Sequence, residues 1–185
     1  MPLANIQRAI DRQKDKNASQ LQEVTYEGYG PGGVAIIVEC TTDNLNRTYP
    51  DVRLAFSRHG GNLAEKGSVA FQFERRGLIH IKEKGEAIFE IAVEAGALDI
   101  SEEEDGTILY TDPKDLSQVR KSLEGSGYTI LSVELAYVPK TNVNIEDIDV
   151  AGKIIRLMDA LEDLEDVSNT FVNFDISEDI LAQLD

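Results

Sequence analysis

The 185-residue chain is 42% hydrophobic and 28% charged, which suits one large or two small soluble domains with real cores. Its single cysteine excludes an internal disulfide and a thiolate metal cluster, and no apolar run reaches the roughly 20 residues of a membrane helix. The polar start of the chain has no secretory pattern, so we expect a cytoplasmic protein, or a mitochondrial-matrix protein if it is organellar.

The negative charge is concentrated in the second part of the chain. Residues 1–80 hold 10 Lys/Arg and 9 Asp/Glu, a net of +1, and residues 81–185 hold 8 and 25, a net of −17. These values give the overall charge of −16. Because phosphate binding needs clustered Lys and Arg, a surface that meets a nucleic acid is expected within the first 80 residues.

The first elements are a helix and three strands. Apolar residues at helical spacing predict a short helix over 3–12, followed by a polar linker at 13–22. Strands are predicted at 24–28, 34–40 and 68–74. Between the last two, a helix is predicted to start at Thr48 as N-cap, with Pro50 in its first turn, and to end at Gly60–Gly61.

Residues 78–138 read as a unit of their own. Its predicted order is strand 78–82, helix 86–95, strands 98–101 and 107–111, a helix after Asp112–Pro113, and a long strand that ends near Tyr137. This β-α-β-β-α-β order is the ferredoxin-like pattern.

The last elements complete an interrupted domain. A helix at 148–164 and a strand at 168–174 supply what the early β-β-α-β segment lacks. The sequence therefore predicts an α+β fold with two ferredoxin-like α/β sandwich domains, one inserted into the other, preceded by a short N-terminal helix. The predicted boundaries are 1–22 for the helix and linker, 23–77 plus 145–176 for the discontinuous domain, and 78–140 for the inserted domain.

Two glycine-rich segments are candidates for contact with a partner. Residues 28–33 match G-x-G-x-x-G, but a strand follows and Pro31 lies inside, so a dinucleotide site is not expected. The interpretations are a tight hairpin loop, or a loop that a partner's backbone approaches. Residues 57–62 (SRHGGN) indicate either a phosphate-binding turn or an ordinary helix end. The candidate partner-contact residues are Gly28, Gly30, Gly32, Gly33, His59, Gly60 and Gly61.

No catalytic centre, metal site or cofactor is expected. His59 and His80 fall in different predicted domains, and Cys40 ends a core strand, where a small buried residue is the interpretation. The acidic stretches 102–105 and 159–166 lack the spacing of a calcium loop and are interpreted as solvated surface.

Basic residues of the first predicted domain are candidates for nucleic-acid backbone contact, with a solvated face as the alternative. They are Arg47, Arg53, Arg58, Lys66, Arg75 and Arg76. No exposed aromatic pair is expected among them, so base stacking is not expected.

The segment 26–77 resembles the central block of the YebC/PmpR family. The shared features are YEGYGPGG at 26–33, TDN-x-NRT at 42–48, R-x-AF-S-x-HGGN at 53–62 and GSVA-x-x-FER-x-G at 67–77. The opening MP-x-x-NI-x-RAI and the late L-x-DA-LED extend the resemblance over nearly the whole chain.

The resemblance implies a non-enzymatic gene-expression factor. Bacterial members are described as probable transcriptional regulators that bind DNA, and others, including mitochondrial translational activators, act at the ribosome. The family fold has a helical N-terminal domain followed by two α+β domains. Its Lys/Arg-rich segment before MP-x-x-NI has no counterpart here, so we expect weakened nucleic-acid binding. A small-molecule-sensing module and a protein-interaction module remain alternatives.

Overall fold

The computed structural model describes residues 21–184, so the helix expected at 3–12 lies outside the described residues. The chain divides into two compact units. Of the described residues, unit 1 comprises those up to Gln72 and from Pro139 onwards, and unit 2 comprises Phe73–Val138. Unit 2 starts earlier than the expected residue 78 because the strand β4 runs unbroken over Phe73–Ile81.

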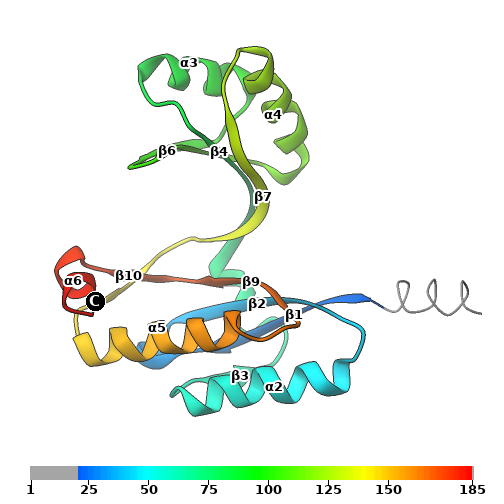
Figure 1. The fold of residues 1–185 in the computed structure, drawn as a ribbon, viewed down its shortest axis with the longest axis vertical. Helices are drawn as coiled ribbons and strands as arrows, with labels where there is room; N and C mark the ends of the chain where they lie inside the picture. The colour runs from blue at the N-terminus through cyan, green and yellow to red at the C-terminus, as the bar shows by residue number, and fades with distance from the viewer. Residues whose placement is uncertain (1–20, 185) are drawn as a thin grey trace, which may run out of the picture. The chain divides into compact units, whose positions relative to one another are not determined.

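Unit 1 is built on a four-stranded antiparallel sheet with the order β3-β1-β2-β9 (Figure 1). The central hairpin joins β1 (Gln22–Tyr29) to β2 (Ala35–Thr42) through the 3-10 turn η1 (Pro31–Gly33). The outer strands are β3 (Asn62–Ala64) and β9 (Val167–Val172). Two more strands, β8 (Val143–Ile145) and β10 (Phe174–Ile176), pair in parallel, and α6 (Glu178–Leu184) follows them.

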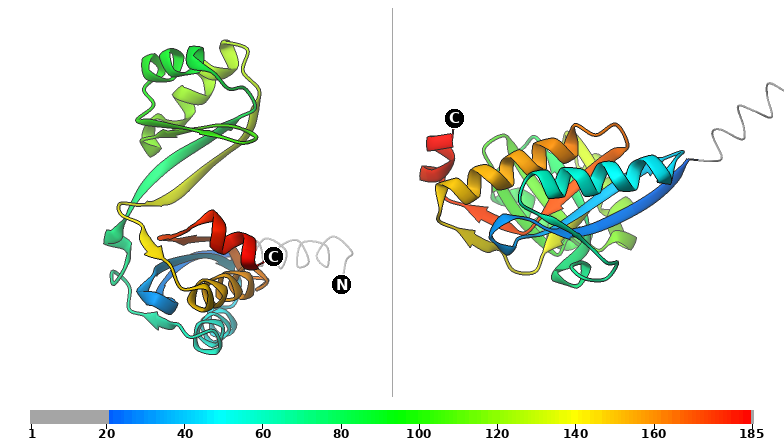
Figure 2. Two further views of the ribbon diagram at one scale, coloured as in Figure 1. Left: turned by 90° about the vertical axis from the view of Figure 1, so that its left-hand side faces the viewer. Right: turned by 90° about the horizontal axis from the view of Figure 1, so that it is seen from below.

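Two helices cover one face of this sheet. Figure 2 shows α2 (Leu45–Arg58) and α5 (Ile148–Glu162) side by side on it. Alternate residues of β2 face these helices, because successive strand side chains point to opposite faces. The core of unit 1 includes Ile36, Val38, Cys40, Val52, Phe56, Ile154, Leu157 and Leu161, all nearly fully buried.

The start of α2 differs from the expectation. Asn44, not Thr48, is the N-cap, and its side chain accepts a hydrogen bond from the Asn46 N–H at 3.1 Å. Thr48 lies inside the helix, where its hydroxyl is 2.8 Å from Asp166 Oδ2 and 2.7 Å from the Thr42 hydroxyl. Pro50 is therefore also inside the helix.

The strand expected at 68–74 does not form over its first half. The buried carboxylate of Glu27 accepts hydrogen bonds from the backbone N–H groups of Gly67, Val69 and Ala70. These bonds hold the segment as a loop that leads into the 3-10 turn η2 (Ala70–Gln72). The N–H groups that a strand ladder would use are bound to a side chain instead.

Unit 2 has the strand order β5-β6-β4-β7, the ferredoxin-like arrangement. Its remaining elements are α3 (Glu86–Ala95), β5 (Asp99–Glu103), β6 (Gly106–Thr111), η3 (Pro113–Asp115), α4 (Leu116–Gly125) and β7 (Ile130–Pro139). Both helices lie on one face of the sheet (Figure 1), over a core that includes Ile79, Ile81 and Leu109.

The expected fold class is confirmed: the protein is α+β, with two α/β sandwiches and one interrupting the other. Unit 1 has the same two layers as unit 2 but a different connectivity, because its two central strands form a hairpin. Within residues 21–184, no helix is both long and apolar enough to span a membrane.

Candidate nucleic-acid interface

The two glycine-rich segments meet in unit 1. A Cβ atom on Gly60 would lie 3.5 Å from Cγ of Pro31, and one on Gly61 would lie 2.5 Å from the Tyr29 carbonyl oxygen. The turn that ends α2 therefore sits against the turn that joins β1 to β2. The predicted partner-contact residues are brought together, although they lie about 30 positions apart in the sequence.

Three of these glycines are explained by packing. Gly28, Gly30 and Gly61 are buried. A Cβ on Gly28 would lie 2.7 Å from Phe56 Cε1, and one on Gly30 would lie 2.9 Å from Ile36 Cδ1. No side chain fits there, so these residues allow the hairpin to pack closely on α2 and on its own second strand.

The other three glycines form exposed turns. Gly32, Gly33 and Gly60 have φ values of 74°, 77° and 78°, in the left-handed region that favours glycine. All three are solvent-exposed, so they remain available to a partner, together with the half-exposed His59.

The SRHGGN segment is a helix end. The Gly61 N–H donates to the Phe56 carbonyl at 2.8 Å, and the His59 N–H donates to the same oxygen at 3.2 Å. These N–H groups are thereby occupied and cannot bind a phosphate. Arg58 is the last residue of α2 and is exposed.

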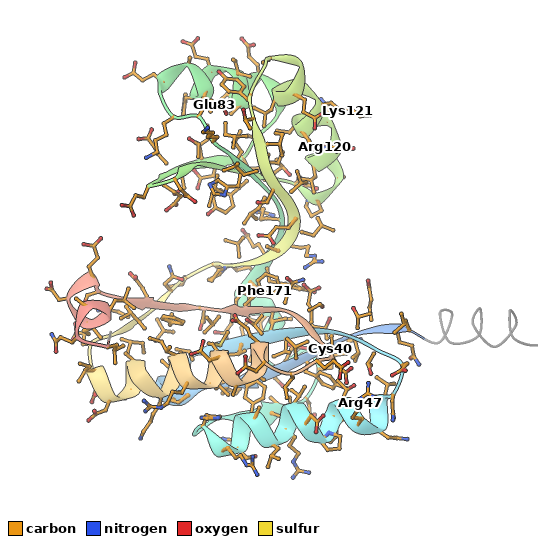
Figure 3. All side chains as sticks on the ribbon, viewed as in Figure 1. Cys40, Arg47, Glu83, Arg120, Lys121 and Phe171 are labelled. Atoms are coloured by element: carbon orange, nitrogen blue, oxygen red, sulfur yellow. The ribbon has the colours of Figure 1, made fainter. Side chains whose placement is uncertain are left out.

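Arg47 differs from the other candidate cations on α2 because its charge is already paired. Its Nε and Nη2 donate to the two carboxylate oxygens of Asp166 at 3.1 and 2.8 Å, and Nη2 also donates to Asp43 at 3.0 Å. The hydrogen bonds from Arg47 hold the pKa of Asp166 below its ordinary value. Figure 3 shows Arg47 on α2. The two hydrogen bonds between Arg47 and the Asp166 carboxylate tie the start of α2 to the turn between α5 and β9.

Three other candidate cations of unit 1 are exposed. Arg53 and Arg58 lie on α2, and Lys66 lies in the loop held by Glu27. Among residues 21–184, no carboxylate lies within 4.0 Å of the charged groups of these three side chains. Their charges are therefore available to a phosphate.

Arg75 and Arg76 belong to the other unit. Both lie on β4, within unit 2. The Arg75 guanidinium stacks on the Tyr137 ring at 4.4 Å, and Arg76 forms an ion pair with Glu74 at 2.8 Å. The six predicted contact residues thus do not form one cluster within one unit.

An aromatic pair lies beside these cations, and of its two rings Tyr49 is exposed and Tyr26 is half-buried, so the expectation that no exposed pair is present holds for Tyr26 only. The rings of Tyr26 on β1 and Tyr49 on α2 have centroids 6.1 Å apart and planes 52° apart. They line a groove of about 500 Å³, together with Thr25, Glu27, Leu63, Ala64, Glu65 and Lys66. Tyr49 precedes Arg53 by one helical turn, a spacing visible in the sequence. The contact between the Tyr49 and Tyr26 rings depends on tertiary packing, so no local sequence pattern predicts it.

The reactive residue types lie apart. His59 is in unit 1, and His80 is in unit 2, where its Nε2 is 3.4 Å from Asp105. Cys40 is buried, and burial together with the nearby Asp166 raises the pKa of its thiol to about 11. Over the described part of the chain, no three His, Cys, Asp or Glu side chains are grouped to hold a metal ion.

The fold and site define an α+β protein of two units with exposed cations on one helix of unit 1. The family described as TACO1/YebC second and third domain matches residues 21–174. The chain is 46% identical over 190 residues to a "probable transcriptional regulatory protein" of Sulfurihydrogenibium sp., covering 100% of this chain and 76% of that one. The protein of the same name from Moorella thermoacetica is 46% identical over 191 residues, with the same coverage.

A solved structure agrees with these relatives. The crystal structure of the conserved hypothetical protein Aq1575 from Aquifex aeolicus superimposes with a TM-score of 0.82 at 45% identity, covering 88% of this chain and 68% of that one. The chain belongs to the TACO1/YebC family, and the relatives named above class it with regulatory proteins.

Proposed function

We propose that this chain is a non-enzymatic regulator of gene expression that contacts the DNA backbone through α2 of unit 1. The observation that carries the proposal is the exposure of Arg53 and Arg58 on one helix, with no described carboxylate at ion-pair distance. Guanidinium groups in this state bind phosphate oxygens and release counterions. The names of the relatives support a regulatory role.

The acidic character of the chain limits the affinity. A net charge of −16 repels a polyanion, so binding is expected to be no tighter than roughly 10⁻⁴ to 10⁻⁶ M at physiological salt. The same cations can bind ribosomal RNA, so translation control at the ribosome is the second form of this function. Contacts to phosphate alone do not distinguish the two nucleic acids.

Charge reversal on α2 tests the proposal. Duplex DNA and structured RNA are titrated with the wild type and with an Arg53→Glu/Arg58→Glu variant over a range of salt concentrations. Each lost phosphate contact lowers the slope of log K against log salt by about one unit, so we expect a loss of about two. Arg47 is left intact because its replacement breaks the ion pair with Asp166.

A matched control lies on unit 2. Arg120 and Lys121 are neighbours on α4 (Figure 3), and their double replacement by Glu changes the net charge by the same amount. If the slope falls equally in both variants, the effect is one of overall charge and the α2 interface is wrong. Preferential loss of RNA binding in the α2 variant favours the ribosomal form of the function.

The absence of catalysis is part of the proposal. A reactive centre needs a nucleophile and a base within hydrogen-bond reach. The two histidines lie in separate units, and the Cys40 thiol stays protonated near neutral pH because burial raises its pKa to about 11. Hydrolysis of DNA or RNA during the titrations, abolished by His59→Ala or His80→Ala, would refute this part.

A further inference from the structure

We propose that the groove lined by Tyr26 and Tyr49, here called the tyrosine groove, binds an unpaired nucleobase of a single-stranded nucleic acid. The inference rests on the proposed function, since it assigns a second kind of contact to the same surface of unit 1. The groove lies at the junction of β1, α2 and the loop after β3.

The groove has the shape and surface that a base needs. Its volume is about 500 Å³, and Leu63 and Ala64 add apolar lining beside the two rings. Tyr49 is 47% exposed, so a large part of this residue is accessible to a ligand. Stacking on an aromatic ring is how proteins bind unpaired bases with little sequence preference, because every base has a π-face.

The charges around the groove suit a single strand. Lys66 lines it, and Arg53 follows Tyr49 by one turn of α2, so two cations flank the rings. The lining also holds two glutamates: Glu27, whose carboxylate accepts three backbone N–H groups, and Glu65, which is exposed and can turn towards solvent. Burial and the nearby Cys40 raise the pKa of Tyr26, so its hydroxyl adds no negative charge.

The backbone beside the groove can also bind a base. β3 pairs with β1 only from Glu27 to Tyr29, so the outer edge of β1 over residues 22–26 has no partner among the described strands. N–H and C=O groups on a free strand edge can hydrogen-bond to a ligand. Thr25, which lines the groove, lies on this free edge. A duplex hides its base faces in the stack and its pairing edges in the base pairs, so the groove selects single strands.

The test compares a labelled single strand with the duplex of the same sequence, by fluorescence anisotropy at low salt with the full chain. Tyr49→Ala is expected to weaken single-strand binding roughly 5- to 100-fold and to leave duplex binding unchanged. Tyr49→Phe keeps the ring and should retain the affinity. Leu54→Ala is the matched control, since Leu54 lies on the same helix and is also 47% exposed. Unchanged single-strand binding by Tyr49→Ala, or equal loss for both nucleic acids, overturns the inference.

Two further measurements separate this inference from the proposed function. If Arg53→Glu/Arg58→Glu weakens both nucleic acids and Tyr49→Ala weakens neither, the backbone contact stands and the base site is wrong. If Tyr49→Ala alone has an effect, the base site stands and the backbone contact is wrong. Adenosine, which carries no phosphate, isolates stacking: it should shift the ring NMR resonances of Tyr26 and Tyr49, and unshifted rings at millimolar adenosine overturn the inference.

Discussion

Replacing Glu27 by glutamine removes a buried negative charge from unit 1 with almost no change in side-chain size. Glu27 is only 4% exposed. Its Oε2 accepts the Gly67 N–H at 2.6 Å, and its Oε1 accepts the N–H groups of Val69 and Ala70 at 3.0 and 2.7 Å. These bonds fix the loop that carries Lys66 into the tyrosine groove.

The expected loss follows from what glutamine can offer. Its single carbonyl oxygen can keep the bonds to Val69 and Ala70, but as neutral bonds about half as strong as charge-assisted ones. Its NH₂ group then faces the Gly67 N–H, and a buried donor left without an acceptor costs about 1–3 kcal/mol. Removing a buried charge offsets part of this. We expect the free energy of unfolding of unit 1 to fall by about 2 kcal/mol.

The effect depends on pH. Burial by itself raises the pKa of Glu27, but the three backbone hydrogen bonds outweigh it and hold the pKa below its ordinary 4.5. A depressed pKa gives stability that is present above pH 4.5 and is lost as the pH falls through the folded-state value. The difference in free energy of unfolding between wild type and Glu27→Gln should therefore have its full value at pH 7 and should decrease on acidification below pH 4.5.

Urea unfolding at pH 7 and at pH 3 measures both quantities. Glu65→Gln is the control, because Glu65 lies in the same loop and is exposed. It should change the free energy of unfolding by less than about 0.5 kcal/mol. Equal stability of Glu27→Gln and wild type at pH 7, or a gap that widens in acid, would refute the reasoning.

Two further predictions concern the frame around the candidate interface. Asp166→Asn should lower the free energy of unfolding of unit 1 at neutral pH, because Arg47 holds the pKa of Asp166 below its ordinary value of 3.8. The difference from wild type should narrow as the pH falls below 3.8. Urea unfolding across pH checks this, and a difference that does not depend on pH contradicts it. Gly61→Ala should cost about 1–3 kcal/mol, because its Cβ would lie 2.5 Å from the Tyr29 carbonyl oxygen. Gly125→Ala is its control, since a Cβ there meets nothing within 4 Å, and equal unfolding curves for the two variants would rule out the packing account.

Local patterns were enough to place the main helices. The helix predicted at 86–95 begins and ends as expected, since glycines flank it and apolar residues repeat at helical spacing inside it. The order of elements in unit 2 also followed from alternating strand and helix patterns. Local reasoning placed the start of α2 at Thr48 and missed Asn44, because Thr, Pro and Asp in that order are a good helix start by themselves.

The remaining features depend on residues far apart in the chain. Arg47 was predicted to contact a nucleic acid, but Asp166, 119 positions later, takes up its guanidinium. The pairing of Tyr26 with Tyr49 requires β1 to pack beside α2.

The sequence by itself determined the fold class, the order of the main elements and the family resemblance, because periodicity, caps and motifs are local properties. Only the tertiary structure decided which cations stay unpaired, which glycines are packed and which are exposed, and that two tyrosines share a groove. Burial and charge pairing depend on which side chains come into contact when the helices pack on the sheet. Local sequence patterns do not specify those contacts, because the residues involved are far apart in the chain.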